Sequence, residues 1–162
     1  MDFVQLLFLR FPSMAISNIF QKRISEFVDD SELAPAELTR RIDIDPRAFM
    51  LALQYGIIPT PRILIRIADY FKTSVAYLLG TTNEEIFYPA DTASDFFLRI
   101  QQLCSEKNVS YYRVAKQCHF DKGYISRWIK QKYFPSWELL DILADYFKVS
   151  LDYLLGRTDE RD

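Results

Sequence analysis

Residues 143–156 read LADYFKVSLDYLLG and residues 67–80 read IADYFKTSVAYLLG, so the chain carries one pattern twice at an offset of 76. The offset holds without a gap in both directions, and it pairs Phe20 with Phe96 near the start of the two copies. Each copy, roughly 65 residues long, is large enough to bury a core of its own, and the pattern occurs only twice. The repeat therefore predicts tandem domains rather than a solenoid.

The connector between the copies, NEEIFYPADTA, is acidic and contains Pro89, as is typical of a linker. Outward from the repeat, the chain divides into five predicted parts. These are an apolar N-terminal extension (1–14), a first domain (15–82), the linker (83–91), a second domain (92–158) and a tail (159–162).

Within each copy the apolar residues follow a helical period. In 136–147 they form one stripe that includes Leu140, Leu143 and Phe147. Serine and threonine residues stand where helix N-caps belong, and Gly80 and Gly156 stand where the last helices end. No segment alternates as a strand, so the fold class is all-α, with two tandem five-helix domains joined by a short linker. Besides 136–147, the expected helices are 19–31, 35–41, 46–55, 95–107, 111–117 and 122–131. Thr60 and Ser136 are expected as N-caps of the fourth helix of each copy. Ser74 and Ser150 are expected as N-caps of the last short helix of each copy.

The composition fits a folded chain without metal or cofactor chemistry. Its 162 residues are 49% hydrophobic with a net charge of −2, which argues against a surface coated in positive charge. Cys104 and Cys118 align with the apolar Val28 and Ile42, so both thiols are expected in the core, and free thiols fit a reducing cytoplasm. His119 is the single histidine, and neither metal-ligand spacing nor a catalytic triad accompanies it, which disfavours an enzyme.

The apolar segment FVQLLFLRF at 3–11 is too short to cross a membrane, and Asp2 stands where a signal peptide needs basic residues. Two interpretations stay open. The segment serves packing or dimerisation, or translation starts at Met14.

The second copy contains a motif that points to function. The helices predicted at 111–117 and 122–131 are separated by Cys118, His119 and Phe120 alone. Two short helices joined by so tight a turn are typical of a helix-turn-helix, whose second helix can lie in a DNA major groove.

Across the second copy, a known pattern is matched by Ser110, Val114, Ala115, Tyr124, Ile125, Ser126, Trp128, Pro135, Ser136, Leu140, Leu143, Ala144, Phe147, Val149, Ser150, Asp152, Leu154, Leu155 and Gly156. With these residues the whole second copy resembles the phage Cro/repressor (XRE) family of helix-turn-helix regulators, whose fold is that of lambda repressor. His119 replaces a glycine that is usual in the turn, and histidine tolerates a left-handed backbone, so the turn is expected to survive. Gln131 likewise replaces a glycine after the third helix, and Tyr111 replaces a glutamine.

The resemblance implies that the third helix faces base edges and that the loop after it grips phosphates. The chemistry of the residues agrees, because arginine makes bidentate contacts with guanine and lysine reaches the same acceptors. Residues 110–134 also hold six basic residues against one acid. The base-contact candidates are Lys122, Gly123, Tyr124, Ser126 and Arg127; the phosphate-contact candidates are Tyr111, Lys116, Lys130 and Lys132.

The first copy lacks this character. Residues 34–58 hold three basic and three acidic residues, and Met50 and Leu51 stand where the second copy has Ser126 and Arg127. We expect an interface candidate at Met50, Leu51 and Tyr55, covered by a second subunit, the N-terminal segment or another protein. The alternative is that these side chains only pack internally.

Together these features predict a cytoplasmic transcriptional regulator, without cofactor, that binds a double-stranded DNA operator through its second domain and acts as a repressor. A homodimer would place two reading helices about 34 Å apart on a palindrome. One alternative is an antitoxin-like or adaptor protein that uses the apolar face of the first domain. Another is a pseudo-dimer in which both domains contact DNA. No small-molecule ligand and no membrane association are indicated.

Overall fold

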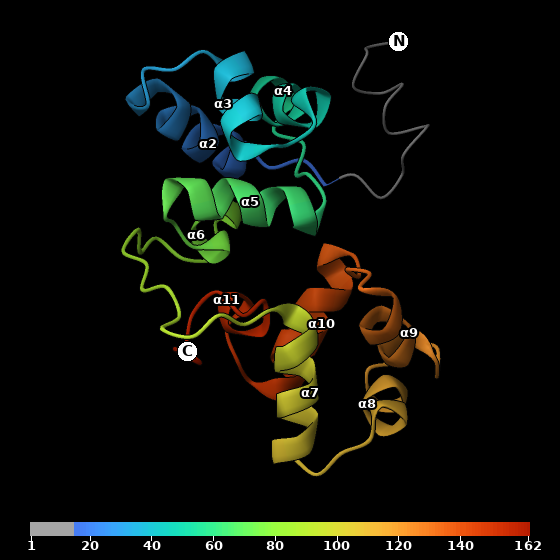
Figure 1. Cartoon of the computed structure of the whole chain (residues 1–162). Helices are drawn as coiled ribbons and strands as arrows, with labels where there is room; N and C mark the ends of the chain where they lie inside the picture. Colours follow the sequence, from blue (N-terminus) through green and yellow to red (C-terminus); the bar gives the residue numbers. More distant parts are fainter. Residues whose placement is uncertain (1–14) are drawn as a thin grey trace. The chain divides into compact units, whose positions relative to one another are not determined.

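The computed structural model describes residues 15–162, so the N-terminal extension lies outside the described residues. The chain forms two compact units, with the boundary between Glu85 and Ile86 (Figure 1). Each regular element in the described residues is a helix, and one isolated bridge pairs Ile16 with Ile57. The predicted all-α class is confirmed.

The seven helices with a predicted range match it to within two residues. In the first unit they are α2 (Asn18–Asp30), α3 (Pro35–Ile42), α4 (Pro46–Tyr55), α5 (Pro61–Phe71) and α6 (Val75–Leu79). In the second unit they are α7 (Phe96–Glu106), α8 (Tyr111–Gln117), α9 (Tyr124–Gln131), α10 (Trp137–Phe147) and α11 (Leu151–Leu154).

Residues with left-handed backbone recur at the offset of 76. His119 has φ +59° and its counterpart Asp43 has +58°. Lys132 has φ +52°, where the first unit has Gly56. The other pairs of positive-φ residues at this offset are Glu32 with Asn108, Lys72 with Lys148, and Gly80 with Gly156. The two units therefore share their turns as well as their helices.

Short polar side chains start most of the helices. Ser110 accepts the backbone N–H of Arg113, and Ser74 and Ser150 cap the last helices in the same way. Thr60 and Ser136 occupy the expected N-cap positions, but neither side chain makes a capping hydrogen bond. The prediction was thus right in position and wrong in mechanism for these two helices.

The core of the second unit is apolar, with Phe96, Ile100, Leu103, Val114, Ile125 and Leu140 fully buried. Cys104 is 4% exposed and Cys118 9% exposed, which confirms the expectation of core thiols. Burial raises the pKa of the Cys104 thiol to about 11.

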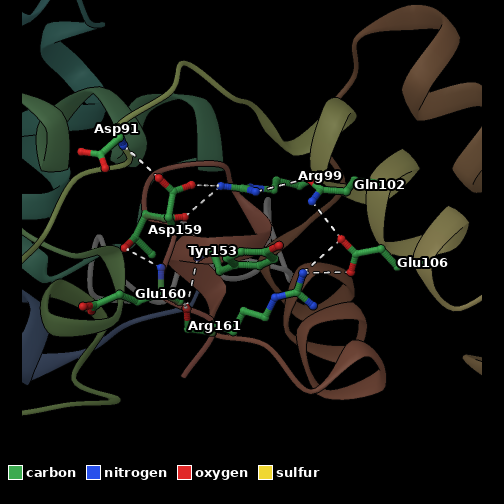
Figure 2. A network of polar contacts seen from close by, with 10 residues as sticks. Asp91, Arg99, Gln102, Glu106, Tyr153, Asp159, Glu160 and Arg161 are labelled. Carbon is green, nitrogen blue, oxygen red and sulfur yellow. Dashed lines mark hydrogen bonds and ion pairs between the residues drawn. The ribbon is translucent and has the colours of Figure 1, made fainter.

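Both ends of the second unit are fastened to its body (Figure 2). The guanidinium of Arg99 donates to the carboxylate of Asp159 at 2.6 Å and lies over the ring of Tyr153. The backbone N–H of Asp91 donates to the same carboxylate at 2.9 Å. Part of the predicted linker is therefore held on the second unit, as is the predicted tail.

Candidate nucleic-acid interface

The turn between α8 and α9 is built by backbone geometry. Cys118 ends α8, and the left-handed His119 then reverses the chain, so the predicted tolerance of histidine in this turn is confirmed. The N–H of Phe120 donates to the carbonyl of Ala115 at 2.8 Å, which closes the turn against α8.

One side of α9 fixes the helix to the unit. Ile125 is fully buried and Trp128 is 3% exposed, and the ring of Trp128 packs 5.8 Å from that of Phe120 and 5.6 Å from that of Tyr124. Ile129, one turn after Ile125, is half-buried.

The other side of α9 carries most of the residues predicted to contact bases. Ser126 and Arg127 are exposed, as is Lys122 just before the helix. Gly123 forms the N-cap and is half-buried with Tyr124. The structure therefore brings these five candidates together at the first turns of α9, with three of them open to solvent.

Arg127 is held from two directions. Its Nη2 lies 3.9 Å from Oδ1 of Asp121, and its guanidinium carbon lies 5.5 Å from the centre of the Tyr124 ring. Both side chains of the ion pair are more than half exposed, so the pair alone contributes little to folding.

The phosphate candidates occupy different surroundings. Lys116 and Lys130 are exposed at the ends of α8 and α9. Lys132 follows Gln131, the last residue of α9, and ends the helix in a left-handed conformation. Its Nζ lies 4.7 Å from the centre of the Phe97 ring. Tyr111 is half-buried, and burial raises its phenol pKa, with Cys104 adding to the effect. Tyr111 lines a shallow groove of roughly 440 Å³ with Gln101, Cys104, Ser105, Asn108, Val109 and Ser110.

Three cations of this surface make no ion pair within the described residues. Lys116, Lys122 and Lys130 make no ion pair with any residue between 15 and 162. The α8–α9 surface, defined here by these lysines with Ser126 and Arg127, thus presents uncompensated positive charge. Such a surface suits a polyanion.

On the corresponding surface of the first unit, two of the three arginines are paired internally. Glu37 accepts hydrogen bonds from both Arg40 and Arg41, with an N–O distance of 2.7 Å to each. These two arginines lower the pKa of Glu37 to about 2. Arg66 on α5 pairs with Asp43 at 2.9 Å. The spacings of three and four residues from Glu37 were available in the sequence.

The apolar residues of α4 are more covered than the sequence indicated. Met50, Leu51 and Tyr55 are each half-buried, and none is among the strongly exposed apolar residues of the described chain. On the same helix Phe49 is fully buried, whereas Leu53 is half-buried. An interface at α4 remains a prediction.

The sequence indicated no role for Asp121, which with Tyr124 contacts Arg127. Its Oδ1 accepts the N–H of Gly123 at 3.0 Å, which starts the turn into α9. An Asp followed two residues later by Gly is a turn signal, and that signal could have drawn attention to it.

The comparisons with known proteins concern the second unit. Residues 99–160 match the Cro/C1-type HTH DNA-binding domain, so this unit contains a helix-turn-helix domain. The HTH-type transcriptional activator BcrR of Enterococcus faecalis is 33% identical over 62 residues, which are 38% of this chain and 30% of that protein. The match thus spans under a third of the relative's length. No solved structure matches the chain.

Two features are absent from the described residues. No helix in 15–162 is long and apolar enough to span a membrane. No three His, Cys, Asp or Glu side chains in the same residues gather as a metal site requires.

Proposed function

We propose that this protein is a DNA-binding transcription regulator whose second unit reads the major groove with α9. In this proposal Arg127, Lys122 and Ser126 face base edges, with Gly123 and Tyr124 beside them. Lys116, Lys130, Lys132 and Tyr111 contact phosphates and set the register of the helix. A regulator of this kind acts where the genome lies, which in a bacterium is the cytoplasm.

The observation that carries the proposal is the unpaired positive charge of the α8–α9 surface. Of the three lysines without an ion pair, Lys116 lies on α8, Lys130 on α9 and Lys122 in the turn before α9, all within the residues that the Cro/C1-type match covers. A solvated surface of no function would be expected to mix both signs, as the first unit does on α3.

We further propose that the two units are tandem copies of one scaffold and that the first no longer binds DNA. The shared helices and left-handed turns support the duplication. The internal pairing of Arg40 and Arg41 with Glu37 supports the loss of phosphate binding. The first unit would then serve association through Met50, Leu51 and Tyr55 on α4.

The dependence of DNA binding on salt tests this assignment in the full chain. The double variant Lys116→Gln, Lys130→Gln removes two proposed phosphate contacts. The slope of log K against log salt should become flatter by about 1.8, because each contact releases about 0.9 counterion equivalents. Fluorescence anisotropy with the DNA upstream of the protein's own gene measures the slope.

The matched control is Arg40→Gln, Arg47→Gln, which makes the same charge change on α3 and α4 of the first unit. Its slope should equal that of the wild type. Equal flattening in both variants would instead favour the pseudo-dimer in which both units contact DNA. Absence of salt-dependent binding in the wild type would refute DNA binding and favour the adaptor function.

The proposed functional form is a homodimer on a palindrome, with two α9 helices about 34 Å apart. Sedimentation of the full chain with and without duplex measures the stoichiometry, and one chain per duplex would contradict the dimer. We propose repression by occlusion of the promoter. The relative is named as an activator. A transcription assay that compares the wild type with the Lys116→Gln, Lys130→Gln variant therefore decides between repression and activation.

A further inference from the structure

Asp121 is the one acidic residue among residues 110–134, which hold six basic residues. Its side chain is 59% exposed just before α9. A carboxylate on a surface that binds phosphates lowers affinity through like-charge repulsion. The presence of Asp121 on the α8–α9 surface therefore needs a role that offsets this loss of affinity for DNA.

The hydrogen bonds by which Asp121 starts α9 do not explain why the residue is charged. Oδ1 of Asp121 accepts the N–H of Gly123 at 3.0 Å, and the main-chain carbonyl of Asp121 accepts the N–H of Tyr124 at 3.1 Å. The first bond needs only a side-chain oxygen that accepts a hydrogen bond. An uncharged asparagine or serine would supply one equally well. The charge itself is not needed for the turn.

The charge faces Arg127. The same Oδ1 lies 3.9 Å from Nη2 of Arg127, and the Tyr124 ring lies beneath the guanidinium at 5.5 Å. Gly123 lies between the two groups, and a Cβ there would be 3.6 Å from Oδ1 and 3.7 Å from Nη2. A longer side chain at this position would compete for the space in which the pair meets.

We propose that Asp121 is a positioning residue that orients Arg127 for base recognition and raises the discrimination between DNA sequences. The inference rests on the proposed function of α9. Asp121 limits the directions in which the arginine fork can point, so less freedom is lost when the fork meets a guanine edge.

The effect should grow when DNA is bound. Water is displaced from the surface, and the attraction between carboxylate and guanidinium strengthens as the surroundings become less polar. On a site without the matching base, the carboxylate remains close to phosphates without a fully engaged arginine. Asp121 therefore adds a repulsive element against wrong sequences, which is a common basis of specificity.

The test uses the full chain and two probes. One is the duplex that the wild type enriches from a randomised pool, and the other is a scrambled duplex of the same composition. Asp121→Asn keeps an acceptor for the Gly123 N–H and removes the charge. It should bind the scrambled duplex about two- to fivefold more tightly. The ratio of specific to scrambled affinity should fall about tenfold.

The base pair at which preference is lost identifies the mechanism. Duplexes with each position permuted should show that Asp121→Asn and Arg127→Ala relax the same base pair. In the Arg127→Ala background, Asp121→Asn should leave the ratio unchanged, because the two residues act as one unit. The control Asp141→Asn makes the same charge change on an exposed residue of α10 and should leave the ratio at the wild-type value.

Three outcomes would overturn the inference. They are an unchanged ratio in Asp121→Asn, a loss of preference at a different base pair, which would indicate direct contact of Asp121 with a base, and an equal loss in the Arg127→Ala background. Thermal unfolding of each variant checks the fold, and a purely structural role would not move the base preference. If the wild type enriches no sequence, the proposed function itself fails, which is distinct from all three outcomes.

Discussion

Single ion pairs distinguish the charged surfaces of the two units. Lys116 and Arg40 occupy equivalent positions on α8 and α3, since 40 plus 76 is 116. Arg40 is paired with Glu37, whereas Lys116 has no ion pair within residues 15–162. One acid on α3 therefore removes the charge that the second unit keeps available for an anion.

The titration of Glu37 tests this pairing. Because Arg40 and Arg41 lower its pKa from about 4.5 to about 2, the carboxylate should stay ionised far into the acid range. A lowered pKa contributes stability above the unfolded value near 4.5, and that contribution is lost as the pH falls toward 2. Carbon-detected NMR of the Glu37 carboxyl group should give a midpoint near 2.

The double variant Arg40→Gln, Arg41→Gln is the control for this titration. It should return the midpoint of Glu37 toward the ordinary glutamate range. A wild-type midpoint near 4.5 would show that the two arginines are not bound to Glu37 in solution.

At the scale of elements, the helix-turn-helix depends on one left-handed residue. His119 has φ +59°, a conformation that costs L-residues more than it costs glycine. The chain adopts it because Ile125 and Trp128 must reach the core while α9 keeps its outer face exposed. The packing of α9 thus compensates for the strain in the turn.

Replacing His119 by glycine should relieve this strain. We expect His119→Gly to increase the free energy of unfolding of the second unit by up to about 1 kcal/mol, since a left-handed cost of about 1–2 kcal/mol exceeds the added chain entropy. Urea denaturation followed by tryptophan fluorescence measures the change. Trp128 on α9 and Trp137 on α10 both report on this unit.

Lys116→Gly within α8 is the matched control. Glycine at an ordinary helical position should lower the free energy of unfolding by about 1 kcal/mol. If His119→Gly destabilised the unit as much as Lys116→Gly does, the left-handed turn would not be strained.

At the scale of the whole molecule, each unit closes itself with the same arrangement. Arg23 donates to the carbonyl of Thr82 at 2.8 Å and lies 4.0 Å from the Tyr77 ring centre. Arg99 makes the equivalent contacts with Thr158 and Tyr153, the residues 76 positions later. Each arginine therefore fastens the end of its own unit to that unit's first helix.

Removing these arginines should affect the two units separately. Arg99→Ala deletes hydrogen bonds to a carboxylate and a carbonyl, at a cost of about 1–3 kcal/mol in the second unit. Arg23→Ala should act similarly on the first. Hydrogen exchange followed by mass spectrometry should show lost protection in 86–162 for Arg99→Ala and in 15–85 for Arg23→Ala.

Arg113→Ala provides the control, because this arginine is exposed on α8 and its change should stay within about 0.5 kcal/mol. If Arg99→Ala or Arg23→Ala lost protection in both units, the two units would unfold together.

The sequence by itself determined the all-α class, the helix ranges, the left-handed turn at His119 and the core position of the two cysteines. These features follow from local rules, since helical periodicity and caps depend on residues three or four apart. The gathering of the base-contact candidates on α9 was predictable for the same reason. The Glu37 pairing follows the same spacing rule and was open to prediction.

Only the tertiary structure decided which side chains are covered, whereas the contact of Arg127 with Asp121, six residues before it, is local to the start of α9. The half-burial of Met50, Leu51 and Ile129 and the fastening of Asp91 to Asp159 depend on packing as well. The repeated LADYFKVSLDYLLG therefore specified the scaffold of both units, because core packing is encoded in its period. Which side chains of each unit are covered was decided by residues that meet only after folding.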